Sequence, residues 1–312
     1  MILKKSHPLL LMQTATVGYI KTKSGIRLRW GEWKTRVPHR KGTVVVLSGR
    51  REYLEKYDES AHDLTSRGYD VFGFDWRGQG LSSRMLKNPR KGFVHSYDDY
   101  LSDLTRFMES VALPRGEPPF VLMAHSMGAH IGLRYLHDHS KPFQRAVLTS
   151  PLIDIAVPGP FRKIMRLYAA AAVAMRMGER YVPGTGGDDA GTQQFKNNRL
   201  TSDLMRFETV AGQLERNPAL VVGGVTFQWL KATLDSIGIV GSPGFAEKVT
   251  VPVLMVTAGR DTVVCREAQD AICKRLPRCS LVRIEGARHE IPIEANCFRD
   301  RLWEAFDRFM GE

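Results

Sequence analysis

A serine stands where an apolar run meets a helical pattern, in the segment FVLMAHSMGAHIGLRYL at residues 120–136. Ser126 has Ala124 two residues before it and Gly128 two residues after it. This A-x-S-x-G arrangement is a variant of the strand–turn–helix pattern that exposes a nucleophilic serine. A serine hydroxyl is a poor nucleophile until a base accepts its proton, and that base needs a carboxylate to orient it. The segment therefore predicts a nucleophile only if an acid and a histidine occur elsewhere.

Both partners follow Ser126 in the chain. Asp261 and His289 each lie on a glycine-containing loop just past a short apolar run that predicts a strand. Residues that follow the strands of an open α/β sheet meet at the carboxyl edge, and the order Ser, Asp, His is typical of such a site. We predict Ser126 as nucleophile, His289 as base and Asp261 as the orienting acid, with Asp235 and Asp270 as alternatives for the acid.

Negative charge develops on the carbonyl oxygen when a serine attacks an acyl group, so donors are needed for that oxygen. The backbone N–H of Met127 lies at the start of the expected helix, where the helix dipole favours negative charge. The second donor should come from the loop after an earlier strand. The segment LSGR at 47–50 fits this position, and we predict the N–H of Arg50 as the second donor.

Other residues could be read as functional. His125 and His130 flank the serine, but a residue that directly precedes it should point away from its hydroxyl. The segment DWRGQGLS at 75–82 has spaced glycines but lacks the Gly-Lys-Ser/Thr of a phosphate-binding loop. We interpret it as a turn in which Asp75 and Arg77 bind each other.

The elements that must position these residues alternate along the chain. Apolar runs hydrophobic on both faces predict buried strands at 43–47, 69–74, 120–123, 145–149, 253–256 and 281–284. Helical patterns between them cover 57–67, 97–111 and 126–139. This alternation predicts an α/β fold with a mostly parallel central sheet and helices on both faces. Residues 18–35 predict an antiparallel edge hairpin with a turn at Ser24-Gly25.

The alternation stops after residue 151 and resumes near 251. We therefore predict a first core part at 1–151, a helical cap insertion at 152–240 and a second core part at 241–312. Residues 161–177 have apolar residues at helical spacing beside Arg162, Lys163 and Arg166. The simpler expectation is a cap helix that packs its apolar face on the core. The alternative is a basic amphipathic helix that lies in an anionic lipid interface.

Composition narrows the class of protein. The 312 residues include 45 basic and 33 acidic ones, for a formal net charge of +12, and 43% are hydrophobic. No nucleic-acid motif accompanies the charge, so we expect no nucleic-acid partner. The apolar run after Pro8 is too short for a secretory signal, so we expect a cytoplasmic protein.

The spacings of the cysteines fit no zinc motif, and we expect reduced thiols and no metal or organic cofactor. The cysteines are Cys265, Cys273, Cys279 and Cys297.

These motifs resemble the α/β-hydrolase superfamily and, within it, the branch of L2-type lysophospholipases and monoacylglycerol lipases. The resemblance rests on LSGRREY at 47–53 with Tyr57, FDWRGQGLS at 74–82, AHSMG at 124–128, Asp261, His289 and GGVTFQW at 223–229 in the cap. Two positions depart from the common pattern. Ala124 replaces a glycine, and Ser48 replaces the histidine that lipase members carry before the oxyanion glycine.

The resemblance implies a serine hydrolase that acts on a lysophospholipid or a monoglyceride through an acyl-enzyme. Apolar residues of the expected cap favour an acyl chain over the alternative, a small-ester or lactone esterase. A non-catalytic receptor on the same fold would be expected to lack part of the triad, and no part is missing. The charge also admits peripheral contact with the anionic inner face of a membrane.

Overall fold

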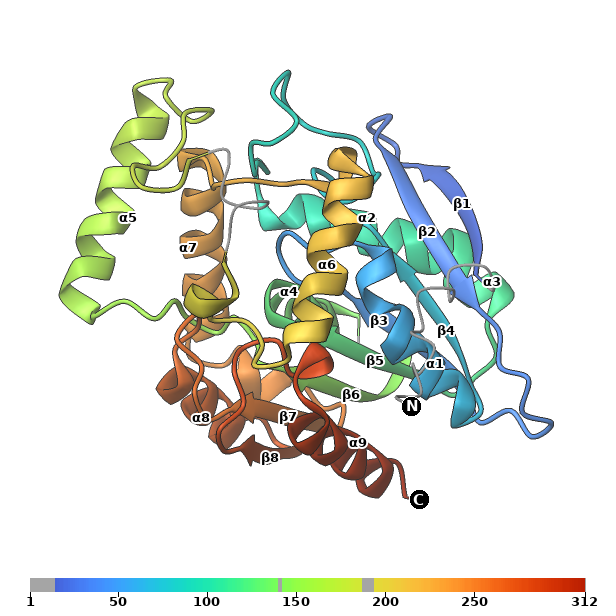
Figure 1. Ribbon diagram of the computed structural model, residues 1–312. Helices are drawn as coiled ribbons and strands as arrows, with labels where there is room; N and C mark the ends of the chain where they lie inside the picture. The colour runs from blue at the N-terminus through green and yellow to red at the C-terminus, as the bar shows by residue number, and fades with distance from the viewer. Residues whose placement is uncertain (1–14, 140–141, 187–193, 312) are drawn as a thin grey trace.

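The centre of the molecule is an eight-stranded sheet in the order β1-β2-β4-β3-β5-β6-β7-β8. The computed structural model describes residues 15–139, 142–186 and 194–311 (Figure 1). The strands are β1 (Thr16–Lys21), β2 (Arg27–Trp33), β3 (Gly42–Leu47), β4 (Tyr69–Phe74), β5 (Phe120–His125), β6 (Phe143–Thr149), β7 (Val253–Ala258) and β8 (Cys279–Ile284). From β4 to β8 neighbouring strands are parallel, whereas β1 and β2 form an antiparallel hairpin that joins β4. The predicted fold class, strand runs and edge hairpin are confirmed.

Helices fill the segments between strands. The α-helices are α1 (Asp58–Ser66), α2 (Tyr97–Phe107), α3 (Leu113–Arg115), α4 (Ser126–Asp138), α5 (Gly159–Ala174), α6 (Leu204–Arg216), α7 (Phe227–Gly241), α8 (Arg266–Arg275) and α9 (Asn296–Met310). Short helical turns are η2 (Leu54–Tyr57), η3 (Met108–Ala112), η4 (Phe195–Asn197), η5 (Pro218–Leu220), η6 (Ala246–Lys248) and η7 (Ile291–Ile293). α2 begins at a capping box on Ser96 and Asp99, and α9 ends at Gly311 in the left-handed region.

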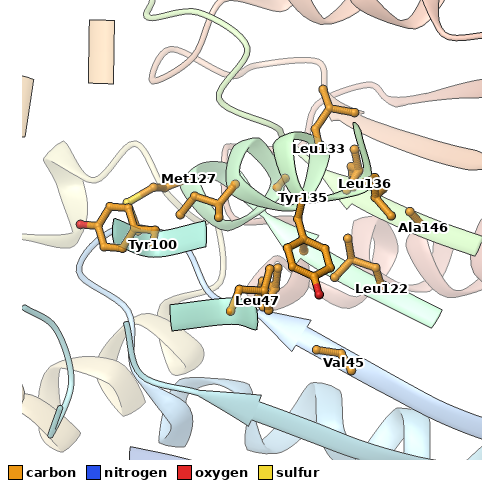
Figure 2. Packing of buried hydrophobic residues seen from close by; sticks show 14 of the residues in the cluster. Val45, Leu47, Tyr100, Leu122, Met127, Leu133, Tyr135, Leu136 and Ala146 are labelled. Atoms are coloured by element: carbon orange, nitrogen blue, oxygen red, sulfur yellow. The ribbon is translucent and has the colours of Figure 1, made fainter. Parts of the chain in front are cut away.

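Two apolar clusters explain why the central strands are hydrophobic on both faces. Alternate residues of a strand point to opposite faces, so Val45 and Leu47 of β3 join one cluster and Val44 and Val46 join the other. α2, α4 and α8 contribute to the first cluster, and α1 and α9 to the second. Figure 2 shows side chains of α4 against those of three strands; the labelled residues there include Met127, Leu133, Tyr135, Leu136, Val45, Leu47, Leu122 and Ala146. Each large apolar side chain buried in this way contributes about 1.5–3 kcal/mol.

The insertion between β6 and β7 is helical. α5 packs on α7 through Ala169, which contacts the cluster of Leu230 and Leu234. In Figure 1, α5 lies at the outer margin of the molecule and α7 lies between it and the remaining helices. The boundaries of the cap at 152 and 240 stay a prediction, but no strand of the sheet falls within the described part of that range.

The apolar face of α5 is a correction to the simpler expectation. Phe161 is 63% exposed, Ile164 61% and Leu167 72%, so these side chains do not pack on the core. The residues of α5 that are buried are the small ones, Ala169 and Ala172. An alanine face lets α5 approach α7 closely and leaves the large side chains outside.

Two further expectations were wrong. Cys273 and Cys279 form a disulfide, with Cα atoms 5.5 Å apart, whereas we expected reduced thiols. The end of α8 and the start of β8 bring the two residues together, and spacing alone does not reveal this.

Asp75 and Arg77 do not bind each other. Asp75 accepts hydrogen bonds from Arg29, at 2.7 Å, and from two backbone N–H groups, and Arg77 binds Asp103.

The predictions about the N-terminal segment concern residues 1–14, which lie outside the described residues, and the cytoplasmic location stays a prediction. None of the helices that the structure describes combines the length and the apolar character that a bilayer span requires.

Candidate active site

The sharp turn at Ser126 between strand β5 and helix α4, called the elbow below, has the geometry that its sequence predicts. β5 ends at His125, α4 begins at Ser126, and Ser126 has a φ of +50°, which residues with a side chain seldom adopt. A Cβ atom at Gly128 would lie 2.4 Å from the carbonyl oxygen of Ser48, so only glycine fits there. Ala124 is accommodated because it is an ordinary strand residue, paired with Leu47 and absent from the residues with positive φ.

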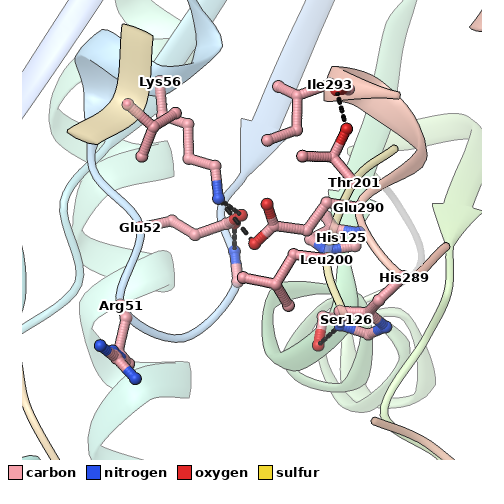
Figure 3. A network of polar contacts seen from close by, with 12 residues as sticks. Arg51, Glu52, Lys56, His125, Ser126, Leu200, Thr201, His289, Glu290 and Ile293 are labelled. Carbon is pink, nitrogen blue, oxygen red and sulfur yellow. Dashed lines mark hydrogen bonds and ion pairs between the residues drawn. The ribbon is translucent and has the colours of Figure 1, made fainter. Parts of the chain in front are cut away.

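The structure brings together the three residues predicted from three separate segments. His289 Nε2 lies 3.0 Å from Ser126 Oγ, and His289 Nδ1 lies 2.7 Å from Asp261 Oδ2. All three residues are buried. In Figure 3, Ser126 and His289 face each other, joined by a dashed line. This arrangement can pass the serine proton to an imidazole whose orientation a carboxylate fixes.

Asp261 is held in its ionised form. Burial alone would raise the pKa of its carboxyl, but the hydrogen bond and charge of His289 outweigh burial and lower that pKa below the usual value. The backbone N–H groups of Val263 and Val264 donate to the other carboxylate oxygen at 2.8 and 3.2 Å and lower the pKa further. The same bonds fix the carboxylate toward His289. The alternative acids lie elsewhere: Asp235 pairs with Lys231 and Arg166 in the cap, and Asp270 pairs with Arg283.

The loop after β3 lies against the start of α4. The N–H of Gly49 donates to Glu52, and the N–H of Arg51 donates to Gln79 Oε1 at 2.8 Å. These two bonds fix the loop on either side of Arg50. The first-turn N–H of Met127 has no partner within its own helix. Arg50 and Met127 line the same cavity as Ser126, which is where oxyanion donors must lie, and their role stays a prediction.

The Arg50 side chain connects the loop to the cap. Its guanidinium lies 5.1 Å from the ring centroid of Trp229 in α7, and it donates to the carbonyl of Gly223. Cation–π contact and a charge-assisted hydrogen bond both join this loop to residues of the insertion.

A buried charge network was missed from the sequence, and its charged residues line the same cavity as Ser126. Lys56 Nζ lies 2.8 Å from Glu52 Oε1 and 2.7 Å from Glu290 Oε1 (Figure 3). Glu52 also accepts hydrogen bonds from Tyr57, at 2.6 Å, and Gly49. Because Glu290 directly follows His289, the ammonium of Lys56 joins the loop that carries His289 to the segment after β3 that carries Glu52. The available signals were the i,i+4 pair Glu52 and Lys56 and an acid adjacent to the predicted base.

The two carboxylates of this network differ. Burial opposes ionisation of Glu52, but Lys56, His125 and the hydrogen bond of Tyr57 lower its pKa to about 2. Burial raises the pKa of Glu290, and the nearby charge of Glu52 adds to that effect. The charge and hydrogen bond of Lys56 lower the pKa but do not outweigh burial and the charge of Glu52. Lys56 therefore balances chiefly the charge of Glu52.

Glu52, Glu290 and His125 could be read as a metal site, because their ligand atoms lie within 4.8 Å of one another. The ammonium of Lys56 already lies between the two carboxylates. A metal ion would have to displace that cation, so the residues present do not fit a metal centre.

The histidines near Ser126 are held by other groups. His125 Nδ1 lies 3.1 Å from the carbonyl oxygen of Thr149, and burial lowers its pKa to about 4. His130 Nδ1 lies 2.7 Å from the carbonyl oxygen of Leu152, and its Nε2 lies 2.6 Å from Ser236. Neither ring is hydrogen-bonded to Ser126, in agreement with the prediction that His125 points away from the hydroxyl.

A cavity of about 400 Å³ opens above Ser126 and His289. Both polar and apolar side chains line it, and the apolar ones are the more numerous. The apolar lining residues are Met127, Leu152, Ile155, Leu200, Phe207, Val210, Ala211, Leu214, Val222, Val225, Trp229, Val263, Val264 and Ile293. One wall belongs to α6 and another to the segment that leads into α7, so the cap forms much of the cavity. A cavity of this size with an apolar lining suits an extended hydrocarbon group.

Comparison with known proteins places the chain among hydrolases. The family described as "Serine aminopeptidase, S33" matches residues 38–296. The chain is 31% identical over 284 residues to Lysophospholipase L2 of Escherichia coli strain K12, covering 88% of this chain and 82% of that protein. It is 30% identical over 268 residues to Probable lysophospholipase L2 of Haemophilus influenzae, covering 86% and 83%.

A solved structure shares the fold. A soluble variant of monoglyceride lipase from Saccharomyces cerevisiae, in complex with a substrate analog, superposes with a TM-score of 0.77 at 19% identity. The match covers 98% of this chain and 99% of that chain.

Proposed function

Because the chain belongs to the family described as "Serine aminopeptidase, S33" and is a serine hydrolase of the α/β-hydrolase fold, we propose that it cleaves carboxylic esters of fatty acids, with lysophospholipids or monoglycerides as substrates. The observation that carries this proposal is the hydrogen-bonded series Ser126, His289 and Asp261, of which Ser126 and His289 line a largely apolar cavity. The names of the relatives support the substrate class.

In the proposed reaction, Ser126 Oγ attacks the acyl carbonyl carbon while His289 Nε2 accepts the serine proton. The backbone N–H groups of Arg50 and Met127 would donate to the oxyanion. His289 then returns the proton to the leaving alcohol oxygen, and the acyl group stays on Ser126. A water molecule, deprotonated by His289, attacks this acyl-enzyme, and the fatty acid leaves as the proton returns to the serine.

The cavity favours long acyl chains over small esters and lactones. Apolar residues from the cap surround the space above Ser126, and a hydrocarbon chain gains about 0.8 kcal/mol for each methylene buried there. A small ester would leave this surface uncovered.

A hydrolysis panel tests the proposal. Lysophospholipids, monoglycerides, short p-nitrophenyl esters and a lactone are compared at matched concentrations. We expect kcat/KM to be highest for the long-chain esters. A preference for short esters or the lactone would replace the proposed function with that of a small-ester esterase. Absence of all hydrolysis would favour a non-catalytic receptor.

Peripheral contact with an anionic membrane is part of the proposal. What supports it is α5, where Phe161, Ile164 and Leu167 are exposed beside Lys163. Apolar side chains flanked by basic ones suit the boundary between head groups and acyl chains. An enzyme seated there would receive its lipid substrate directly from the membrane.

A further inference from the structure

A second cavity lies beside the histidine and aspartate loops. Its volume is about 350 Å³, and its lining differs in chemistry from that of the first cavity. The lining residues are Asn198, Arg199, Gly259, Arg260, Asp261, Thr262, Arg266 and Arg288. Four of the eight are arginines, and the one acid is Asp261, whose carboxylate already binds His289.

The four guanidinium groups face one carboxylate within the lining, that of Asp261, and the charge of Arg266 also acts on Glu267. Arg199 and Arg260 are exposed, and no ion pair joins either of them, Arg266 or Arg288 to a carboxylate in the ranges that the structure describes. Arginines remain protonated, so several around one cavity repel one another and together attract an anion. Within the described residues, the lining of the cavity therefore holds four positive charges against one carboxylate, which His289 already binds.

Two of the arginines are fixed by the backbone. Arg288 donates to the carbonyl oxygens of Asn198 and Thr201 at 3.0 and 2.9 Å, both through the same nitrogen. Arg266 donates to the carbonyl of Gly259. A guanidinium has five N–H donors, so each keeps donors free while its position is set. Fixed donors of this kind suit the oxygens of a phosphate, which arginine binds in a bidentate manner.

The two cavities share one wall. Arg199 lines both, and the next residues, Leu200 and Thr201, line the cavity above Ser126. Asp261, in turn, lines the arginine cavity and binds the histidine that faces the serine. A group held by the arginines would thus lie in a cavity that adjoins the one above Ser126, with Arg199 in the wall between them.

We propose that the cavity of Arg199, Arg260, Arg266 and Arg288 binds a phosphate group, and that its ligand is the phosphodiester of a lysophospholipid whose ester lies at Ser126. In a lysophospholipid the glycerol backbone separates the ester from the phosphate, which matches two adjoining cavities, one apolar and one basic. This inference rests on the proposed function and adds a preference for phosphate-bearing substrates over monoglycerides.

A substrate-pair experiment tests the head-group source. The kcat/KM of a lysophosphatidylglycerol and of a monoacylglycerol with the same acyl chain is measured in neutral detergent micelles. Arg260→Gln should lower the ratio of the two values by roughly 10-fold, the loss expected for a hydrogen bond to a charged group. The ratio cancels any general effect on the neighbouring Asp261. Arg278→Gln is the matched control. Arg278 is exposed and directly precedes β8, whereas the loop that carries Arg288 follows the opposite end of that strand.

Inorganic phosphate tests a free phosphate as the source. In wild type, phosphate should raise the Tm relative to chloride at equal ionic strength, and Arg260→Gln but not Arg278→Gln should remove that rise. A ratio that stays constant while the Tm rise depends on Arg260 would keep the phosphate site but assign it to a soluble phosphate. If neither readout depends on Arg260, the inference is overturned.

The two proposals can fail separately. A protein that hydrolyses no long-chain ester contradicts the proposed function, while the Tm measurement still reports on the phosphate site. A protein that hydrolyses both substrates with an Arg260-independent ratio keeps the proposed function and loses the head-group assignment.

Discussion

α4 and α5 are both helices with many apolar residues, yet the large apolar side chains of α4 are buried and several of those of α5 are exposed. In α4 the residues from Ser126 to Leu136 are buried, and Gly132 allows close approach to Leu122 and Leu47 of the strands. In α5 the buried residues are two alanines, and Leu167 is 72% exposed. Helical spacing of apolar residues therefore predicts an amphipathic helix but not the surface that its apolar face contacts.

The difference corresponds to two tasks. A nucleophile must be held within a few tenths of an ångström, and close packing around α4 supplies that constraint. A helix that contacts lipid needs an accessible apolar face instead, and α5 has one. This difference supports the proposals that the core carries the chemistry and that α5 contacts lipid, and substitutions in each region can test them.

The largest effect is expected at Ser126. Ser126→Ala should fold normally and lose ester hydrolysis by roughly 10⁴-fold or more, because the variant lacks the hydroxyl that we propose forms the acyl-enzyme. A fluorophosphonate probe should label wild type and leave the variant unlabelled. Labelling that persists in the variant would place the nucleophile elsewhere in the chain.

A slightly smaller loss is expected at the acid. Asp261→Asn should lower kcat by about 10³ to 10⁴ with KM nearly unchanged, because the amide no longer stabilises the imidazolium of His289. Steady-state kinetics on one long-chain ester gives both constants, and Asp270→Asn serves as control. A variant that retains the wild-type kcat would show that another group orients the histidine.

Packing around the elbow is the next test. The Cβ of Ala124 faces α4 near Gly132, so Ala124→Val should crowd the crossing and lower the free energy of unfolding by about 1–3 kcal/mol. The serine hydroxyl would shift, and kcat should fall as well. Denaturant unfolding and kcat are measured together. A Val variant with full stability and full activity would mean that the strand and the helix do not cross tightly there.

A cap substitution should separate membrane binding from chemistry. Leu167→Ser should weaken binding to anionic vesicles by roughly 10-fold, since less apolar surface enters the lipid. Hydrolysis of a water-soluble ester should not change. Leu281→Ser, in the exposed part of β8, is the control. Cosedimentation should weaken with added salt. Equal binding to neutral and anionic vesicles would remove the electrostatic part of the proposal.

The smallest effect is expected from restoring the glycine of the elbow. Ala124→Gly should keep kcat within a few-fold and change the free energy of unfolding by less than about 1 kcal/mol, because Ala124 already has an extended backbone. Thermal unfolding beside wild type measures the difference. A large gain in activity would show that the methyl group constrains the elbow.

Sequence patterns predicted the sheet because its strands are continuous apolar runs. They also predicted that Ser126, Asp261 and His289 lie together, because each follows such a run. They did not predict contacts between residues that are distant in the chain and that belong to no periodic pattern. Lys56 meets Glu290 across 234 positions, and no local pattern encodes that pair.

The exposure of α5 was missed for a different reason. Its small residues, Ala169 and Ala172, pack on α7, whereas hydrophobic spacing gives most weight to large side chains. The pair Asp75 and Arg77 was misassigned because nearness in sequence was taken for contact, while Arg29 and Asp103 approach from other elements.

The positive φ of Ser126 limits where substitutions can make this protein more stable. A residue with a side chain in that region costs roughly 1–3 kcal/mol, and the surrounding fold has to hold it there. Glycine would adopt the same backbone without strain but would remove the hydroxyl. Stability and reactivity are thus opposed at this one position, and a more stable active form must gain its stability at sites remote from the elbow.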